Sequence, residues 1–555
     1  MKKFTAILLA VVMLFALSAS AFAATNSLET DYAIGDGLGV SVDLDIEGMY
    51  FDGSDILNTA TNGYYPFSFS LIASDRSKVA SVTVSNGGSF HWAYAQNADG
   101  SYVTDEDGNY VESTTTNYGV VVLPTTSAST VTVTGTDNIG SATFNCAQPS
   151  GGTTAAGASL YAYLPAPAQF VNEGVTTGGW GDAYDSNGTV KATSSTGVSL
   201  GFFGGYAVYE FENPIADDPT HPYGADFIVY GNAFWNNSEA GCIQVSKDGA
   251  TWYDIAGSMY YTKSTKGASI TYTNPSTSED AGITAAGTNL GTLAPVNYTL
   301  NGTAGTVTTN TFHNHSWFPL NANYFAASGS RAAMAKLDEF SFVSRTLASN
   351  GVTDKLTFTG TLLTDYPGTG KTDQIGFGYC DVHPNKTLGG TIAYNPYQTF
   401  TSSSDYDTKV AGTSGGDPID IAWAVKSNGT PANLDSIRYV RIYTGMAQMN
   451  GIFGEISTEV CGVAACTGST TETAVTPTIS VDGSTVTTTN GGNLPLSKKS
   501  GDYTVNVTGT GYVYINGIAT TSATITPTHT GTKVQIIVQN GEAAPYVTYL
   551  NLQKK

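Results

Sequence analysis

The 555-residue chain has few charged residues and almost no helical periodicity. Charged side chains make up 12% of the chain. Its 23 Lys and Arg are outnumbered by 45 Asp and Glu, which gives a net charge of −22. A surface of this sign repels phosphate backbones and anionic lipids, which argues against nucleic-acid and direct membrane binding. The near absence of helix-type apolar spacing argues against helical bundles and helical repeats.

Long hydrophobic runs are also missing after the first residues, so no membrane-spanning helix is expected in the mature chain. The start of the chain is different. Lys2 and Lys3 precede an apolar segment that ends near Leu17, and the small residues Ala21 and Ala23 stand at the −3 and −1 positions of a cleavage site. This order is typical of a secretory signal peptide cleaved after Ala23. We therefore expect an exported protein that is extracellular or held at the cell surface.

Cysteine is scarce, with five residues in the chain. An odd number in an exported protein leaves at least one thiol unpaired. Cys461 and Cys466 are close enough in sequence to close a small loop, but the spacing is not that of a zinc site. A structural disulfide or free thiols are therefore expected rather than a metal.

Most of the chain alternates apolar and polar residues with a period of two between Gly, Asn, Asp and Pro, as at Val131–Val133 and Phe227–Val229. This pattern predicts an all-β protein. Five or six short strands near the C-terminus indicate an immunoglobulin-like sandwich. The predicted organisation is a signal peptide (1–23), an N-terminal β domain (24–150), a central jelly-roll-like ligand-binding domain (160–465), a linker (466–476) and a C-terminal immunoglobulin-like domain (477–555).

The central blocks contain strands joined by Gly and Asx turns, and Leu434–Tyr443 resembles a late strand of discoidin-like, galactose-binding-like jelly rolls. The chain also resembles large exported cell-surface proteins of gut bacteria, a family without a settled activity. The matching stretches follow the order of that family: Tyr163–Glu173, Gly224–Phe234, Trp252–Ser258, Ile270–Pro275, Phe312–Phe318, Phe358–Thr361, Gly378–Asn385, Asp417–Val425 and Gly454–Glu459. The resemblance implies a cell-surface location and a jelly-roll fold, and no chemistry.

Acidic residues in the central domain lie at or near the ends of predicted strands. The candidates for metal ligation are Asp226, Asp381, Asp417, Asp420 and Glu455. If they converged at one end of a sandwich, they would supply the hard oxygen ligands that Ca²⁺ prefers, so calcium is the expected cofactor. The alternative is that each carboxylate caps a turn or accepts a backbone N–H group.

Histidines and tryptophans supply the candidate ligand-binding residues. His313 and His315 are two positions apart on a predicted strand and point the same way, and His383 lies in another block. Flat rings beside Asn and Asp are how β-sandwich modules bind sugars, and the candidates for this role are Trp180, Trp235 and Trp317. Trp252 and Trp423 are expected in the core.

No catalytic motif is recognisable, neither a Gly-x-Ser-x-Gly elbow nor a His-Glu-x-x-His helix. We therefore predict a non-catalytic binding or adhesion protein, whose central domain recognises an extracellular glycan or surface protein with the help of calcium. Two alternatives stay open. One is capture of a small nutrient such as a corrinoid or haem through a histidine. The other is a polysaccharide-acting hydrolase, because paired carboxylates need only spatial proximity.

Overall fold

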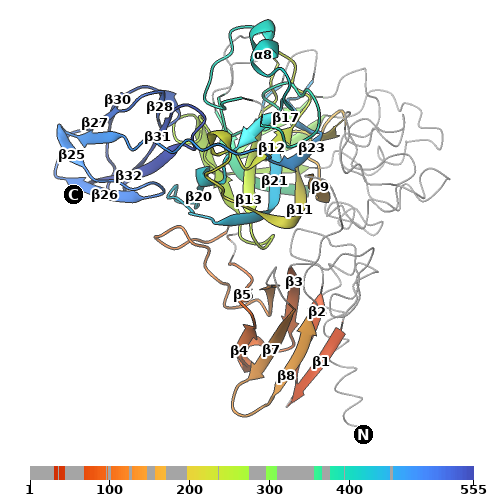
Figure 1. The fold of residues 1–555 in the computed structure, drawn as a ribbon. Coiled ribbons are helices and arrows are strands. Elements are labelled where there is room, and N and C mark those ends of the chain that lie inside the picture. Colours follow the sequence, from red (N-terminus) through yellow and green to blue (C-terminus); the bar gives the residue numbers. More distant parts are fainter. Residues whose placement is uncertain are drawn as a thin grey trace, which may run out of the picture.

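The structure is a computed structural model that describes residues 30–35, 37–43, 68–95, 97, 102–123, 128–146, 157–170, 197–235, 237–273, 295–308, 355–364, 376–392, 394–449 and 454–555. The predicted all-β, multi-domain fold is confirmed (Figure 1). Within these ranges the one α-helix is α8 (Ser403–Lys409), which sequence analysis missed. It is short and polar, and it begins where Ser402 Oγ accepts the Asp405 N–H group at 3.0 Å. No helix of the described part is long and apolar enough to cross a bilayer.

The N-terminal domain is made of two antiparallel sheets. The larger has the order β1 (Thr30–Gly35), β2 (Leu38–Asp43), β3 (Ser68–Ala73), β6 (Tyr118–Val122), β5 (Ser89–Trp92). The smaller has the order β4 (Val79–Val84), β7 (Ser129–Gly135), β8 (Ser141–Cys146). Alternate residues of β7 are buried, as the period of two predicts.

The central domain is built around a two-sheet antiparallel sandwich. One sheet has the order β20 (Ala424–Val425), β14 (Tyr253–Ile255), β13 (Gly241–Ser246), β21 (Ser436–Thr444), β11 (Tyr206–Ala216), β9 (Ser159–Leu164). The other has the order β19 (Asp417–Ile419), β12 (Phe227–Tyr230), β23 (Gly462–Ala465). The predicted core residues Trp252 and Trp423 are 4% and 0% exposed.

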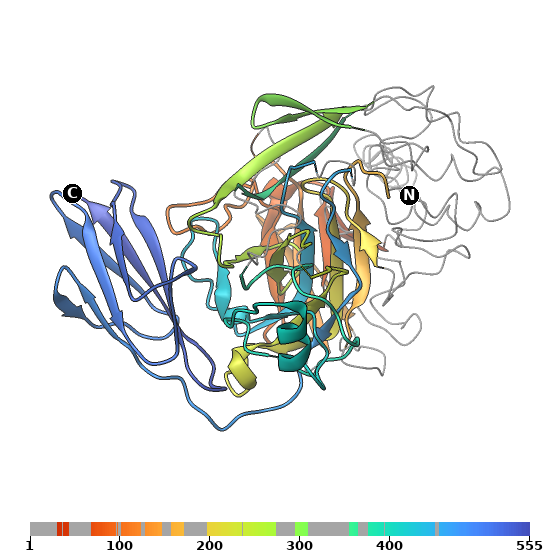
Figure 2. The ribbon, with the colours of Figure 1, turned by 90° about the horizontal axis from the view of Figure 1, so that it is seen from above.

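Two further sheets complete the central domain. A small pair joins β10 (Val198–Ser199) and β22 (Glu459–Val460). A four-stranded arm has the order β17 (Thr303–Val307), β16 (Val296–Leu300), β15 (Ser264–Thr273), β18 (Lys355–Leu363), drawn in green across the top of Figure 2. Ile270, Tyr272 and Phe358 of this arm pack against Phe202 and Phe203.

The C-terminal domain is also a two-sheet sandwich. Its first sheet has the order β25 (Ser484–Val486), β24 (Thr478–Val481), β27 (Tyr503–Thr508), β30 (Ser522–Ile525). Its second has the order β26 (Asn493–Lys498), β32 (Tyr546–Lys554), β31 (Thr532–Gln539), β28 (Tyr512–Ile515), β29 (Ile518–Ala519), in which β26 and β32 are parallel.

Both end domains share hydrophobic packing with the central domain. Successive residues of a strand point to opposite faces of its sheet. On β11, Tyr209 faces the central core, whereas Val208 packs with the core of the N-terminal domain. On β31, Ile537 faces the central core, whereas Ile536 packs inside the C-terminal sandwich. These shared cores place the end domains directly against the central sandwich.

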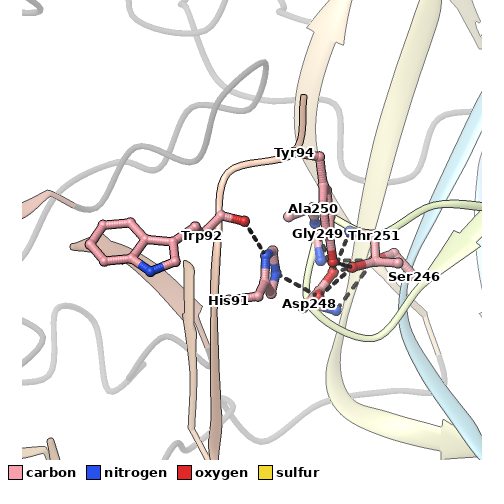
Figure 3. A network of polar contacts seen from close by, with 8 residues as sticks. All are labelled: His91, Trp92, Tyr94, Ser246, Asp248, Gly249, Ala250 and Thr251. Atoms are coloured by element: carbon pink, nitrogen blue, oxygen red, sulfur yellow. Dashed lines mark hydrogen bonds and ion pairs between the residues drawn. The ribbon is translucent and has the colours of Figure 1, made fainter. Parts of the chain in front are cut away.

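Polar contacts reinforce the junction with the N-terminal domain (Figure 3). The turn between β13 and β14 is closed by Asp248, whose Oδ1 accepts the N–H groups of Ala250 and Thr251 at 2.8 and 2.6 Å. From the N-terminal domain, His91 Nε2 lies 3.2 Å from Asp248 Oδ2, and the Tyr94 hydroxyl bonds Thr251 Oγ1 at 2.6 Å. A largely buried His–Asp pair thus joins the two domains.

All five cysteines are buried and none forms a disulfide. Cys461 and Cys466 lie on either side of β23, so the four residues of that strand separate them. A small loop closed by these two residues is not formed, because extended backbone between them holds their thiols apart.

Candidate functional site

The five predicted metal ligands lie around the three-stranded sheet β19–β12–β23. Asp226 immediately precedes β12, and Asp417 and Asp420 begin and follow β19. In the antiparallel pairing Val229 lies opposite Asp417 and Phe227 opposite Ile419. Asp226 and Asp420 are therefore at one end of the sheet, and Asp417 is at the other. The expectation of a single convergent site is corrected: antiparallel pairing divides the set between two ends.

At the first end, three carboxylates form a triad, Asp217, Asp226 and Asp420: one oxygen from each residue lies within 4.8 Å of one oxygen from each of the other two. Asp226 accepts the N–H groups of Asp218 and Ile421, both at 2.9 Å, and His221 Nδ1 lies 3.3 Å from it. Burial, together with the charge of Asp226, raises the pKa of Asp217 to about 7. At neutral pH this triad therefore holds fewer than three negative charges.

The segment from Asp417 to Val425 alternates apolar residues in the sequence, a pattern that favours one continuous strand, but its conformation changes at Asp420. The Asp420 carboxylate accepts the Ala422 N–H group at 2.7 Å and starts a 3-10 turn over Ile421–Trp423. Asp420 is 2% exposed, so it does not reach solvent. A carboxylate that caps its own turn competes with the strand, which explains why the alternation failed as a guide here.

At the other end, Asp381 joins three segments of the chain. It has a left-handed backbone, with φ 62°. Its Oδ1 accepts the Asn232 N–H group at 2.7 Å, its Oδ2 accepts that of Glu459 at 3.2 Å, and its carbonyl accepts that of Glu239 at 3.1 Å. Left-handed backbone is strained for a residue with a side chain. The bonds that Asp381 makes on three sides hold it in this conformation.

Asp381 also belongs to a second acidic triad, with Glu239 and Glu459, in which one oxygen from each residue lies within 4.8 Å of one oxygen from each of the other two. Burial raises the pKa of Asp381 to about 7. Burial and the neighbouring carboxylates raise the pKa values of Glu239 and Glu459, which share a hydrogen bond. No Lys, Arg or His of the described chain forms an ion pair with these three residues. At neutral pH the triad must therefore be neutralised by protons or by a bound cation.

Asp417 and His383 form a buried pair beside this triad. His383 Nδ1 lies 2.8 Å from Asp417 Oδ1, and Asp417 Oδ2 accepts the Val382 N–H group at 3.0 Å. The His383 ring is 5.8 Å from the stacked ring of Tyr406 in α8, and it is edge-on to the rings of Tyr394 and Phe400. Its Nε2 is buried and has no hydrogen-bond partner. A carboxylate that orients one imidazole nitrogen is the arrangement that metal-binding histidines use.

One feature is common to all five predicted metal ligands: each accepts a backbone N–H group. Glu455, the last of them, accepts that of Gln169 at 3.0 Å. Accepting backbone N–H groups fits the alternative that sequence analysis left open, in which acidic side chains fasten loops. The two triads nevertheless offer oxygen donors of the type that calcium prefers, and the calcium site stays a prediction.

Among the predicted aromatic residues, Trp235 is half-buried and its ring centre lies 6.4 Å from that of Tyr406. The exposed ring is that of its neighbour Phe234, which is 71% exposed. Phe234 was not among the predicted binding residues; it stands between the buried Ala233 and the half-buried Trp235. The remaining candidates, Trp180, His313, His315 and Trp317, lie outside the described residues.

The loop that carries Phe234, described at residues 231–235 and 237–240, is fastened at its base. Asp381 accepts the N–H groups of Asn232 and Glu239 at its two ends, and Ser238 Oγ donates to the Val382 carbonyl at 3.1 Å. Gly231 packs against Asp381 so closely that a Cβ would overlap the carboxylate. The loop therefore holds an exposed phenyl ring on a rigid base. We call these nine described residues the Phe234 loop.

Comparison with known proteins adds no assignment: no protein-family model matches the chain, and no curated protein is significantly similar to it.

Proposed function

We propose that this chain is a secreted or cell-surface, non-catalytic binding protein whose central sandwich recognises an extracellular glycan through the Phe234 loop. The observation that carries the proposal is the exposure of Phe234, at 71%, on a loop whose base is fastened by Asp381. A large apolar ring held in water on a rigid support loses little conformational entropy when a ligand covers it. Such rings are typical anchors of binding surfaces.

The contribution of the ring follows from its exposed area. Complete burial of a phenylalanine side chain is worth about 1.5–3 kcal/mol. Because 71% of Phe234 is still exposed, a ligand that covers it gains about 1–2 kcal/mol, or roughly 5–30-fold in affinity. One ring of this kind anchors a ligand and leaves the remaining affinity to polar contacts.

The surroundings of the ring favour a sugar over an apolar partner. Asn232 and Asn237 supply side-chain amide groups from the same loop. Sugars combine an apolar face that stacks on rings with hydroxyls that bond to such groups. The net charge of −22 disfavours acidic polysaccharides, so neutral glycans are the expected class.

A glycan array followed by calorimetry tests this proposal on the whole exported chain. Phe234→Ala is expected to weaken binding of the selected glycan about 5–30-fold. Ile518→Ala is the matched control, because Ile518 is 53% exposed but belongs to the C-terminal domain. Absence of binding to any glycan, or equal binding by wild type and Phe234→Ala, would contradict the proposal.

Two parts of the proposal need their own measurements. Export predicts that the secreted protein begins at Ala24, which mass spectrometry of the secreted protein determines directly. Calcium assistance predicts that EDTA weakens glycan binding and that added calcium restores it. A retained Met1 would contradict the first, and an affinity that EDTA does not change would contradict the second.

A second candidate function, capture of a corrinoid or haem, is favoured by one observation. The Nε2 atom of His383 has no partner, and Asp417 orients the other ring nitrogen. Ligation would require Tyr406 and α8 to move, since the Tyr406 ring stacks on His383. Haemin or a corrinoid should then shift its absorption band on mixing with the protein, and His383→Ala should abolish the shift. An unshifted band with wild-type protein would refute this candidate.

A further inference from the structure

A cleft of about 440 Å³ lies where the three domains meet. The N-terminal domain contributes the turn 105–109, which an orange loop carries toward the C-terminal domain in Figure 1. The central domain contributes residues between Lys426 and Asn433, directly after β20. The C-terminal domain contributes Gly491–Asn493, together with Lys533 and Asn551. The volume of the cleft is in the range of small-molecule binding sites, which often occur at domain interfaces.

Hydrogen bonds fix the walls of this cleft. Asn428 Nδ2 donates to the Glu106 carbonyl at 3.2 Å, and Ser427 Oγ donates to the Gly108 carbonyl at 3.3 Å, so two domains are joined at its rim. The Tyr261 hydroxyl donates to the Gly429 carbonyl at 2.9 Å. The turn itself is closed by Asp105, whose carboxylate accepts the Asn109 N–H group at 2.8 Å. The cleft is therefore preformed.

The lining is almost entirely hydrophilic. Pro431 is its one apolar side chain, and no aromatic ring takes part among the described residues. Five asparagines dominate it: Asn109, Asn428, Asn433, Asn493 and Asn551. Each amide both donates and accepts hydrogen bonds, as a sugar hydroxyl does. The pattern matches a ligand with many hydroxyl groups and little apolar surface.

The charges that line the cleft balance. Lys426 and Lys533 are matched in number by Glu106 and Asp107. Within the described chain neither lysine side chain makes a hydrogen bond or an ion pair. Neither sign of charge dominates this lining, which favours an uncharged ligand.

We propose that this cleft is a second binding site, that it takes a short uncharged glycan, and that the bound glycan bridges all three domains. The site shares the ligand class of the proposed function but none of the residues of the Phe234 loop. Its success or failure is therefore separable from that of the loop.

The test uses the full exported chain and an array of neutral and acidic oligosaccharides of known structure, followed by calorimetry. Asn493→Ala should weaken binding of a neutral oligosaccharide about 5–10-fold, because one or two hydrogen bonds are lost. Asn540→Ala is the matched control: this asparagine is exposed in the same domain but does not line the cleft. Phe234→Ala should leave this affinity unchanged.

If Asn493→Ala does not fold, Lys533→Gln provides the same test, because the Lys533 side chain makes no bond within the described protein. Three results would overturn the proposal: no neutral oligosaccharide binds, only acidic ones bind, or binding is insensitive to both cleft variants. If Phe234→Ala removes glycan binding and neither cleft variant does, the Phe234 loop is supported as a glycan site and the cleft is rejected as one.

Discussion

Replacing His91 with glutamine should weaken the junction between the N-terminal and central domains most strongly at mildly acidic pH. His91 lies between two acceptors: Nδ1 is 3.0 Å from the Trp92 carbonyl and Nε2 is 3.2 Å from Asp248 Oδ2 (Figure 3). A neutral imidazole has one N–H group, whereas the imidazolium has two. The charged form alone can therefore donate to both acceptors.

The pKa shifts of the pair give the sign of the pH dependence. Burial by itself would lower the pKa of His91, but the hydrogen bond and charge of Asp248 outweigh it, and the pKa is raised. Its contribution to stability is therefore complete below about pH 6.5 and is lost as the pH rises through the folded value. Burial would raise the pKa of Asp248, but its bonds to His91 and to backbone N–H groups lower it. The contribution of Asp248 to stability is present above about pH 3.9 and is lost as the pH falls through the pKa of Asp248 in the folded protein.

The magnitude follows from the burial of the pair. The side chains of His91 and Asp248 are 15% and 12% exposed, so solvent screens them little. A hydrogen bond to a charged group contributes about 1.5–3 kcal/mol, and a neutral one about 1 kcal/mol. Glutamine can donate one neutral bond to Asp248. We expect His91→Gln to lower the free energy of unfolding by about 2 kcal/mol near pH 6 and by less than about 1 kcal/mol near pH 8.5.

Urea unfolding of wild type and His91→Gln at about pH 6 and about pH 8.5 measures this difference. Other titrating groups act equally in both proteins, so the change in the difference between the two pH values isolates His91. His529→Gln is the control, because His529 is exposed and lies in the C-terminal domain. A destabilisation by His91→Gln that is the same at both pH values would refute the reasoning.

Three other expectations concern the core and the acidic triads. Burial and the charges of Glu239 and Asp381 raise the pKa of Glu459, so its contribution is present at acidic pH and is lost as the pH rises through the folded value. The unfolding temperature of Glu459→Gln should therefore decrease less than that of wild type between about pH 6 and pH 9, which calorimetry records. If calcium neutralises a triad, it should raise the unfolding temperature near pH 8 and EDTA should reverse the rise; an unchanged temperature would argue for protons instead. Trp423 is fully buried and donates to the Tyr397 hydroxyl at 2.8 Å, so Trp423→Ala should cost about 3–5 kcal/mol in urea unfolding, against almost nothing for the exposed Ile518→Ala.

Features of the fold that depend on neighbouring residues were predictable from the sequence. The period of two indicated an all-β protein, and Trp252 and Trp423 were expected inside it. Both expectations rest on local order, because alternation decides which face a side chain joins. The segment after Asp417 was an exception, since the Asp420 side chain caps a turn that interrupts the strand.

The candidate site was predictable only in part. Asp226 and Asp417 lie at strand ends, whereas Asp381 follows an isolated bridge at Cys380, and the division of the acidic residues between two ends depends on the pairing of β12 with β19. That pairing joins residues almost two hundred positions apart in the sequence. Glu239 and Glu459 meet Asp381 for the same reason, and no local pattern marks them as partners.

The amino-acid sequence by itself determined the set of strands, the sign of the surface charge and the residues suited to the hydrophobic core. The tertiary structure decided which side chains meet: it set Phe234 outward on a fastened loop, enclosed His383 among aromatic rings, and made one cleft from three domains. The physical reason is the distance along the chain over which each interaction acts. Strand alternation acts between adjacent residues, whereas burial, shared protons and the shape of a cleft arise only when distant segments pack together.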